Sequence, residues 1–182
     1  AEGRKGTAPE AERWRAIEER VLAAVHVVHT PSVFERDWIV EHFPGKTVRD
    51  VPIYFWDELP IDGAPADGGD LRARSGLLFV GGFRHPPNED GMTWFTREIW
   101  PLIRAAEPQT QLHLVGGHPN AEMRALHGEA VRVHGRLGDE ELDSAYLGAR
   151  VVVVPLRYGA GVKGKLIEAF AWGVPVVTTS VG

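Results

Sequence analysis

The chain has 182 residues, of which 43% are hydrophobic and 25% charged, a composition typical of a water-soluble globular protein. Its net charge of −5 gives no electrostatic reason to expect nucleic acid or an anionic membrane as a partner, and its lack of cysteine excludes disulfides and thiolate metal sites. No apolar run approaches the ~20 residues of a membrane span, and the first residues, AEGRKGTAPEAER, lack the apolar core of a signal peptide. We therefore expect a cytoplasmic protein.

Residues 1–56 predict a small helix–strand–helix–strand segment. From their apolar periodicity and cap residues we expect helices over 9–24 and 32–42 and strands over 25–30 and 47–53. A segment of about 55 residues with this content is too small for a stable domain. The chain also starts without Met and stops directly after a strand-like run, so we expect a fragment whose first 56 residues are the end of a larger domain.

Residues 57–76, DELPIDGAPADGGDLRARSG, are rich in Asp, Gly, Pro and Ala and contain few aliphatic side chains. This composition is typical of a linker, and a long surface loop is the alternative. We interpret 57–76 as the linker to a second domain over 77–182.

From residue 77 onward strands and helices alternate at ~20–25 residues, which predicts right-handed crossovers and a parallel, doubly wound α/β sheet. The expected strands lie over 77–80, 111–115, 131–134, 151–156 and 174–180. The segment FRHPPN, residues 83–88, is expected to be a loop. Pro101 should kink or divide the helix that follows, because proline lacks the N–H of a helical residue. In the common strand order 3-2-1-4-5, the first and fourth strands are neighbours.

The stretch VVVVPLRYGAGVKGKLIEAFA, residues 151–171, combines a buried strand, a glycine-rich turn and a helix. Such a turn directs backbone N–H groups and a helix N-terminus toward one point, which suits a phosphate. Gly159, Gly161 and Gly164 spell the dinucleotide fingerprint G-x-G-x-x-G, but on the fourth strand rather than the first. The spacing also imitates a P-loop, with Leu166 where Ser or Thr would hold Mg²⁺. A turn that only lets strand and helix approach closely is the structural alternative.

The carboxyl ends of the first and fourth strands should form one crevice, because the winding direction of the sheet reverses between them. Both ends bear glycine and basic residues. The residues expected to line the crevice are Gly81, Gly82, Arg84 and His85 in the first loop, and Tyr158, Gly159, Ala160, Gly161, Val162, Lys163 and Lys165 in the second. Two loops far apart in the sequence would thus surround one anion.

Four side chains near these loops have a specific chemical interpretation. The Arg84 guanidinium offers a bidentate fork for phosphate. Lys165 lies in the first turn of a helix, where the helix dipole disfavours a cation unless the cation faces an anion. Glu168 either accepts hydrogen bonds from sugar hydroxyls or pairs with Lys165, and His85 is either a donor to the ligand or a turn residue. The other histidines show no metal-ligand spacing, so we expect no metal site.

Two stretches resemble the family-4, or group 1, glycosyltransferases, which are two-domain enzymes of the GT-B fold. They are FVGGFRHPPN at 79–88 and VPLRYGAGVKGKLIEAFAWGVPVVTT at 154–179, and the resemblance extends over 77–182. The stretch AVHVVHTPSVFER at 24–36 is similar to the end of the N-terminal, acceptor-side domain of such an enzyme.

This resemblance implies a Rossmann-like domain that binds a nucleoside-diphosphate sugar, in an enzyme of the hexosyltransferase type. The family transfers sugars with retention of configuration and without a metal or other cofactor. Arg84 and Lys165 would be the catalytic residues: with the N–H groups of Gly82 and Gly161 they would hold the diphosphate and stabilise it as it leaves.

The resemblance also implies contacts to the nucleoside. Glu168 would meet the ribose hydroxyls, and the backbone at Arg136 and Leu137 would lie against the base. The acceptor, which can be a saccharide, a lipid-linked group or a small molecule, stays open.

Two departures from the family pattern bear on these expectations. Ala160 stands where the family has the first Glu of its E-x7-E element, so the usual carboxylate contact to the donor sugar is missing. Asn88 and Glu89 occupy the region where the family has a further lysine. We expect the fragment to bind donor weakly at most and not to catalyse transfer alone. The alternatives are a non-catalytic nucleotide-binding module with a degenerate site, a UDP-sugar 2-epimerase on the same fold, an NAD-dependent dehydrogenase, or a purely structural use of the fold.

Overall fold

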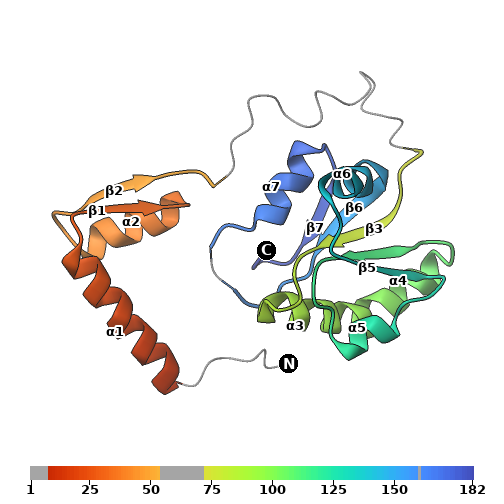
Figure 1. The fold of residues 1–182 in the computed structure, drawn as a ribbon, viewed down its shortest axis with the longest axis horizontal. Coiled ribbons are helices and arrows are strands. Elements are labelled where there is room, and N and C mark those ends of the chain that lie inside the picture. Colours follow the sequence, from red (N-terminus) through yellow and green to blue (C-terminus); the bar gives the residue numbers. More distant parts are fainter. Residues whose placement is uncertain (1–7, 54–71, 160) are drawn as a thin grey trace. The chain divides into compact units, whose positions relative to one another are not determined.

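The computed structural model describes residues 8–53, 72–159 and 161–182, and the chain divides into two compact units, Ala1–Phe55 and Trp56–Gly182 (Figure 1). Residues 57–71 of the predicted linker lie outside the described residues. Its last residues, Ser75 and Gly76, already belong to the first strand of the second unit. The linker itself stays a prediction.

The first unit contains two helices and a two-stranded parallel sheet. Its elements are α1 (Ala8–Ala24), β1 (Val27–Thr30), α2 (Val33–His42) and β2 (Thr47–Asp50). Ser32 caps α2 because its side chain accepts a hydrogen bond from the Glu35 N–H at 3.3 Å. Arg36 of α2 binds Asp50 of β2, with 2.7 Å between Nη1 and Oδ1. The helix–strand–helix–strand order agrees with the sequence pattern.

The second unit is a five-stranded parallel sheet with helices on both faces. Its elements are β3 (Ser75–Val80), α3 (Pro86–Trp94), the π-helical turn η2 (Phe95–Ile99), α4 (Trp100–Ala106), β4 (Leu112–Val115), α5 (Ala121–Ala125), β5 (Val131–Gly135), α6 (Asp139–Gly148), β6 (Ala149–Val154), α7 (Gly164–Ala171) and β7 (Val176–Thr178). The strand order is β5-β4-β3-β6-β7, which is the predicted 3-2-1-4-5 when the strands of this unit are counted alone. The predicted doubly wound α/β fold is confirmed.

The central strands are apolar on both faces because helices cover both. Figure 1 shows α3, α4 and α5 on one side of the sheet and α6 and α7 on the other. On β3, Phe79 belongs to the core under the first group of helices and Leu78 to the core under the second. Val153 and Val152 alternate in the same way on β6, and all four side chains are buried. This explains why these strands read as continuous apolar runs.

The first helix of this unit differs from the expectation at its start. The segment 83–88 is only partly a loop, because α3 begins at Pro86. Prolines are tolerated in a first helical turn, where their missing N–H groups would have no partner. Pro101 divides the helix, as predicted: it lies in the first turn of α4, directly after η2.

Candidate functional site

The carboxyl ends of β3 and β6 lie side by side, because the two strands are parallel neighbours with Leu78 opposite Val152. The chain runs from β3 to β4 and β5 on one side of β3, and then returns to β6 on the other side. The winding direction therefore reverses between these two strands, and the loops that follow them meet at one edge of the sheet. The crevice was predicted at this position.

Lys165 joins the two loops. It is the second residue of α7, and its ammonium donates to Oδ1 of Asn88 in α3 at 2.5 Å. The same Nζ lies 5.0 Å from the centre of the Phe79 ring on β3. Burial is the main reason that the pKa of Lys165 is lowered to about 8; the Glu168 carboxylate opposes this shift, and the charge of Lys163 adds to it.

Gly81 leaves the space that this contact needs. A β-carbon at Gly81 would lie 2.8 Å from Nδ2 of Asn88, closer than such atoms pack, and in a tight contact of 3.0 Å with Nζ of Lys165. Asn88 is 4% exposed, and its Nδ2–H donates to the Gly82 carbonyl at 2.9 Å. Sequence reasoning noted Asn88 only at the position of an absent lysine and missed this contact. No local pattern reveals it, because the partners belong to three different segments.

A second contact joins α3 to the loop that follows β6. Arg157 and Asp90 form a bidentate ion pair, with 2.8 Å between Nε and Oδ2 and 2.5 Å between Nη2 and Oδ1. The guanidinium also lies 5.9 Å from the centre of the Trp94 ring. Its hydrogen bonds with Asp90 raise the pKa of Arg157. Asp90 thus balances the charge of Arg157.

The other predicted residues of the first loop are exposed to solvent. They are Gly82, Arg84 and His85. Among the described residues, the contact between the two loops runs through Asn88 rather than through Arg84 or His85.

The second loop forms the glycine turn that was expected. The predicted residues Tyr158, Val162, Lys163 and Lys165 are half-buried. Gly159 and Gly161 have φ angles of +134° and +77°, which side chains with a β-carbon rarely adopt. The Lys163 ammonium donates to the Gly161 carbonyl of its own turn at 2.7 Å. Ala160 lies outside the described residues.

The residues predicted to contact the nucleoside lie directly after β5 and on α7. Glu168 of α7 accepts a hydrogen bond from the hydroxyl of Tyr146 at 2.9 Å, and Tyr146 is buried in α6. Arg136 and Leu137 directly follow β5; Arg136 is exposed, and Leu137 packs against the core under α6 and α7. The roles assigned to all these residues stay predictions.

Within 8–53, 72–159 and 161–182, no group of three or more His, Cys, Asp or Glu side chains is arranged to hold a metal ion. His113 and His134 bond each other across β4 and β5, with 3.0 Å between Nδ1 and Nε2. Burial lowers the pKa of both rings. In the same described ranges, no helix is both long and apolar enough to cross a membrane.

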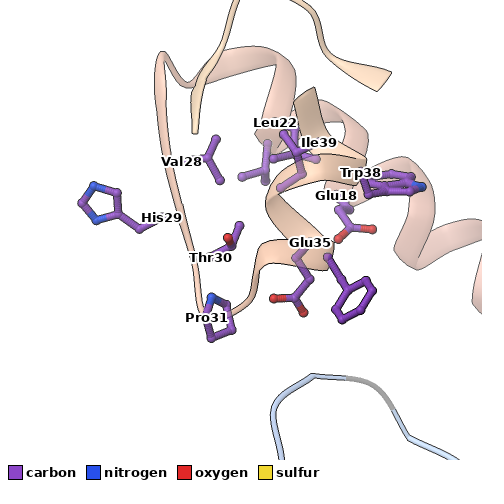
Figure 2. Close-up of a pocket in the computed structure, with 11 residues that line it drawn as sticks. Glu18, Leu22, Val28, His29, Thr30, Pro31, Glu35, Trp38 and Ile39 are labelled. Atoms are coloured by element: carbon purple, nitrogen blue, oxygen red, sulfur yellow. The ribbon is translucent and has the colours of Figure 1, made fainter. Parts of the chain in front are cut away.

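A pocket of about 580 Å³ lies between α1 and α2 of the first unit, at the end of β1 (Figure 2). Figure 2 shows Leu22 and Ile39 close together in it, and the carboxylate of Glu18 beside Trp38. None of the predicted site residues lines this pocket.

Comparison with known proteins identifies the family. The family described as "Glycosyl transferases group 1" matches residues 74–182, a range that includes all five strands of the second unit and the loops that follow β3 and β6. The chain belongs to this family. The resemblance seen in the sequence is thereby confirmed.

Two relatives of this group 1 chain show how much of a longer protein it represents. An "Uncharacterized 44.6 kDa protein in cps region" of Klebsiella pneumoniae is 31% identical over 113 residues, which are 58% of this chain and 29% of that protein. The crystal structure of a GtfA/B complex has a TM-score of 0.64 at 15% identity, over 93% of this chain and 33% of the other. This group 1 chain thus spans about a third or less of either relative. The structural likeness concerns the fold alone, and it supports the predicted Rossmann-like half of a GT-B glycosyltransferase.

Proposed function

We propose that the full-length protein transfers a sugar, of hexose type, from a nucleoside-diphosphate sugar to an acceptor, and that this chain supplies the donor-binding half. The observation that carries the proposal is Lys165, a half-buried ammonium where two glycine-bearing loops meet at the switch point of a parallel sheet. Ligands of doubly wound sheets bind at this point. A half-buried ammonium beside exposed backbone turns favours an anionic ligand, because the anion offsets the cost of partly removing the charge from water.

The reaction needs stabilisation of a leaving diphosphate. When the bond between the anomeric carbon and the diphosphate oxygen breaks, negative charge grows on that oxygen. In the proposed mechanism the Lys165 ammonium and the Arg84 guanidinium stabilise this charge, and the N–H groups of Gly82 and Gly161 add hydrogen bonds. Because two cations already serve this purpose, the proposed transfer needs no metal, and it proceeds with retention as the family resemblance implies.

The nucleoside is held beside the diphosphate in this proposal. Glu168 accepts hydrogen bonds from the ribose hydroxyls, with its carboxylate oriented by Tyr146, and the backbone at Arg136 and Leu137 lies against the base. The acceptor, whether a saccharide, a lipid-linked group or a small molecule, binds to residues outside this chain. We therefore propose that the chain alone binds donor but does not transfer the sugar, in keeping with its 29% share of the Klebsiella relative.

Ala160 supports a second candidate, a nucleotide-binding module without transferase activity. It stands where the family pattern has a carboxylate for the donor sugar. Both candidates bind a nucleoside diphosphate, and they differ only in turnover. Sugar transfer by the full-length protein would favour the enzyme, and its absence despite tight nucleotide binding would favour the module.

Calorimetric titration of the 182-residue chain with UDP, GDP, ADP and NAD⁺ tests the proposed site. We expect a nucleoside diphosphate to bind with a micromolar to millimolar Kd, and Lys165→Ala and Arg84→Ala each to weaken it by about tenfold, because each removes a charge-assisted hydrogen bond. Lys46→Ala is the matched control, since the Lys46 ammonium bonds backbone carbonyls of the first unit. Binding that survives Lys165→Ala unchanged would contradict the site, and selective NAD⁺ binding would favour a dehydrogenase.

A further inference from the structure

Asn88 is a buried amide to which the proposed mechanism assigns no role. It lies in the first turn of α3 and is 4% exposed. Its Nδ2–H donates to the Gly82 carbonyl at 2.9 Å, and its Oδ1 accepts from the Lys165 ammonium at 2.5 Å. Buried amides are normally hydrogen-bonded, but both bonds of this amide go to the two segments that form the crevice.

The partners of Asn88 determine the orientation of its amide. A carbonyl oxygen only accepts hydrogen bonds and an ammonium only donates them, so Nδ2 must face Gly82 and Oδ1 must face Lys165. Exchanging the two amide atoms would leave both contacts repulsive. The backbone at Gly82 therefore holds the amide, and the amide holds the ammonium.

We propose that Asn88 is the positioning residue of the donor site: it keeps the Lys165 ammonium at the Gly81-Gly82 turn, in reach of a diphosphate. The inference rests on the proposed function for the identity of the ligand. A lysine side chain is long and flexible, and ordering it during binding weakens affinity. Because Asn88 orders the ammonium in the ligand-free protein, that entropy is already lost before the diphosphate arrives.

Aspartate and leucine have nearly the shape of asparagine but should change Lys165 in opposite directions. The carboxylate of Asn88→Asp would raise the pKa of Lys165 and compete with a diphosphate for the ammonium. The apolar side chain of Asn88→Leu would leave the ammonium without its acceptor and lower its pKa further. The other charges that act on Lys165, those of Glu168 and Lys163, are the same in both variants.

The test measures the pKa of Lys165 in the ligand-free, 182-residue chain by NMR of ¹³C-labelled lysine. The chain has four lysines, and Lys165→Arg identifies the signal. We expect Asn88→Asp to raise this pKa by about 1 unit or more and Asn88→Leu to lower it. Both variants should weaken binding of the nucleoside diphosphate at neutral pH by about tenfold.

Asn120→Ala is the matched control for these variants. Asn120 caps α5 and donates to Glu89 of α3, so its loss should lower the melting temperature and leave the pKa of Lys165 unchanged. A Lys165 pKa that is unchanged in both Asn88 variants, or that shifts in the same direction in both, would overturn the proposal. If Asn88→Leu does not fold, the sign of the shift in Asn88→Asp decides. If the wild-type chain binds none of UDP, GDP and ADP, the donor-binding function fails, while the two pKa shifts still decide whether Asn88 positions Lys165.

Discussion

The ammonium of Lys165 lies among Phe79, Gly81 and Asn88, where its protonated form loses hydration that it would keep at the surface. Its pKa is lowered from 10.5 to about 8 for this reason above all. A diphosphate in the crevice would supply the opposite charge and raise the pKa again. The free and the occupied site therefore differ in protonation above about pH 8, and binding then takes up a proton.

We expect the affinity for the nucleoside diphosphate to fall by up to about tenfold per pH unit above about pH 8. The reason is that the ligand selects the protonated form of Lys165, which the free site loses as the pH rises through its pKa. Calorimetry between about pH 6.5 and 9.5, in buffers of different ionisation enthalpy, measures both Kd and proton uptake.

Lys165→Arg is the control for this pH dependence, because a guanidinium stays protonated over the whole range. Whatever its absolute affinity for the nucleoside diphosphate, this variant should not lose affinity as the pH rises through about 8. A wild-type Kd that is equal at about pH 7 and pH 9.5 would mean that the ammonium of Lys165 does not bind the ligand.

At the scale of elements, α3 approaches the loop after β6 closely at Gly91. A β-carbon at Gly91 would lie 2.5 Å from the carbonyl oxygen of Pro155. The ion pair between Asp90 and Arg157 joins the same helix and loop beside this contact. Because Pro155 directly follows β6, the approach sets the position of α3 against the switch point, and Asn88 lies one turn earlier on the same helix.

Gly91→Ala should therefore destabilise the protein by about 1–3 kcal/mol, because the helix must move off a backbone carbonyl. Alanine also has a higher helix propensity than glycine, by about 1 kcal/mol, and this gain offsets part of the loss of stability. Gly148→Ala is the matched control: Gly148 ends α6, and a β-carbon there would meet no atom within 4 Å. It should be neutral or stabilise by up to about 1 kcal/mol. Urea unfolding measures both, and equal changes in the two variants would refute the close packing of α3.

The elements themselves were largely predictable, and their exceptions have local causes. Strand positions follow from apolar runs that end in glycine or proline, and these signals are properties of a few consecutive residues. The start of α3 was predicted too late because Pro86 and Pro87 read as a loop signal, although a first helical turn accepts them equally well. The division of the helix before Pro101 followed directly from the missing proline N–H.

At the scale of the whole molecule, the two units differ in how much apolar surface they bury. Among residues 8–53, the buried apolar side chains are those of Leu22 and Ile39, while Phe34 is 88% exposed and Trp14 63%. The second unit has two extensive core clusters, one on each face of its sheet. A segment that buries so little apolar surface cannot offset the conformational entropy of folding, whereas the second unit can.

We expect residues 72–182 to fold when produced alone and to unfold cooperatively, and residues 1–53 alone to lack stable structure. Circular dichroism with thermal unfolding distinguishes the two outcomes, and the 182-residue chain is the reference. A cooperative transition in the piece 1–53 would contradict the argument from burial. Loss of cooperativity in 72–182 would show that the second unit depends on the first.

The sequence by itself indicated the strand order of the second unit and the edge of the sheet where the two glycine-bearing loops meet. Both follow from periodicity, turn residues and the handedness of crossovers, which are encoded in neighbouring residues. The motifs at 79–88 and 154–179 separately carried the resemblance to the family. Only the tertiary structure decided that Asn88 bonds Lys165, that Asp90 balances Arg157, and that burial lowers the pKa of Lys165. Each of these depends on distances between residues that are far apart in the chain. Those distances are set by the packing of α3 and of the loop after β6 over the ends of the strands, and no local sequence pattern encodes that packing.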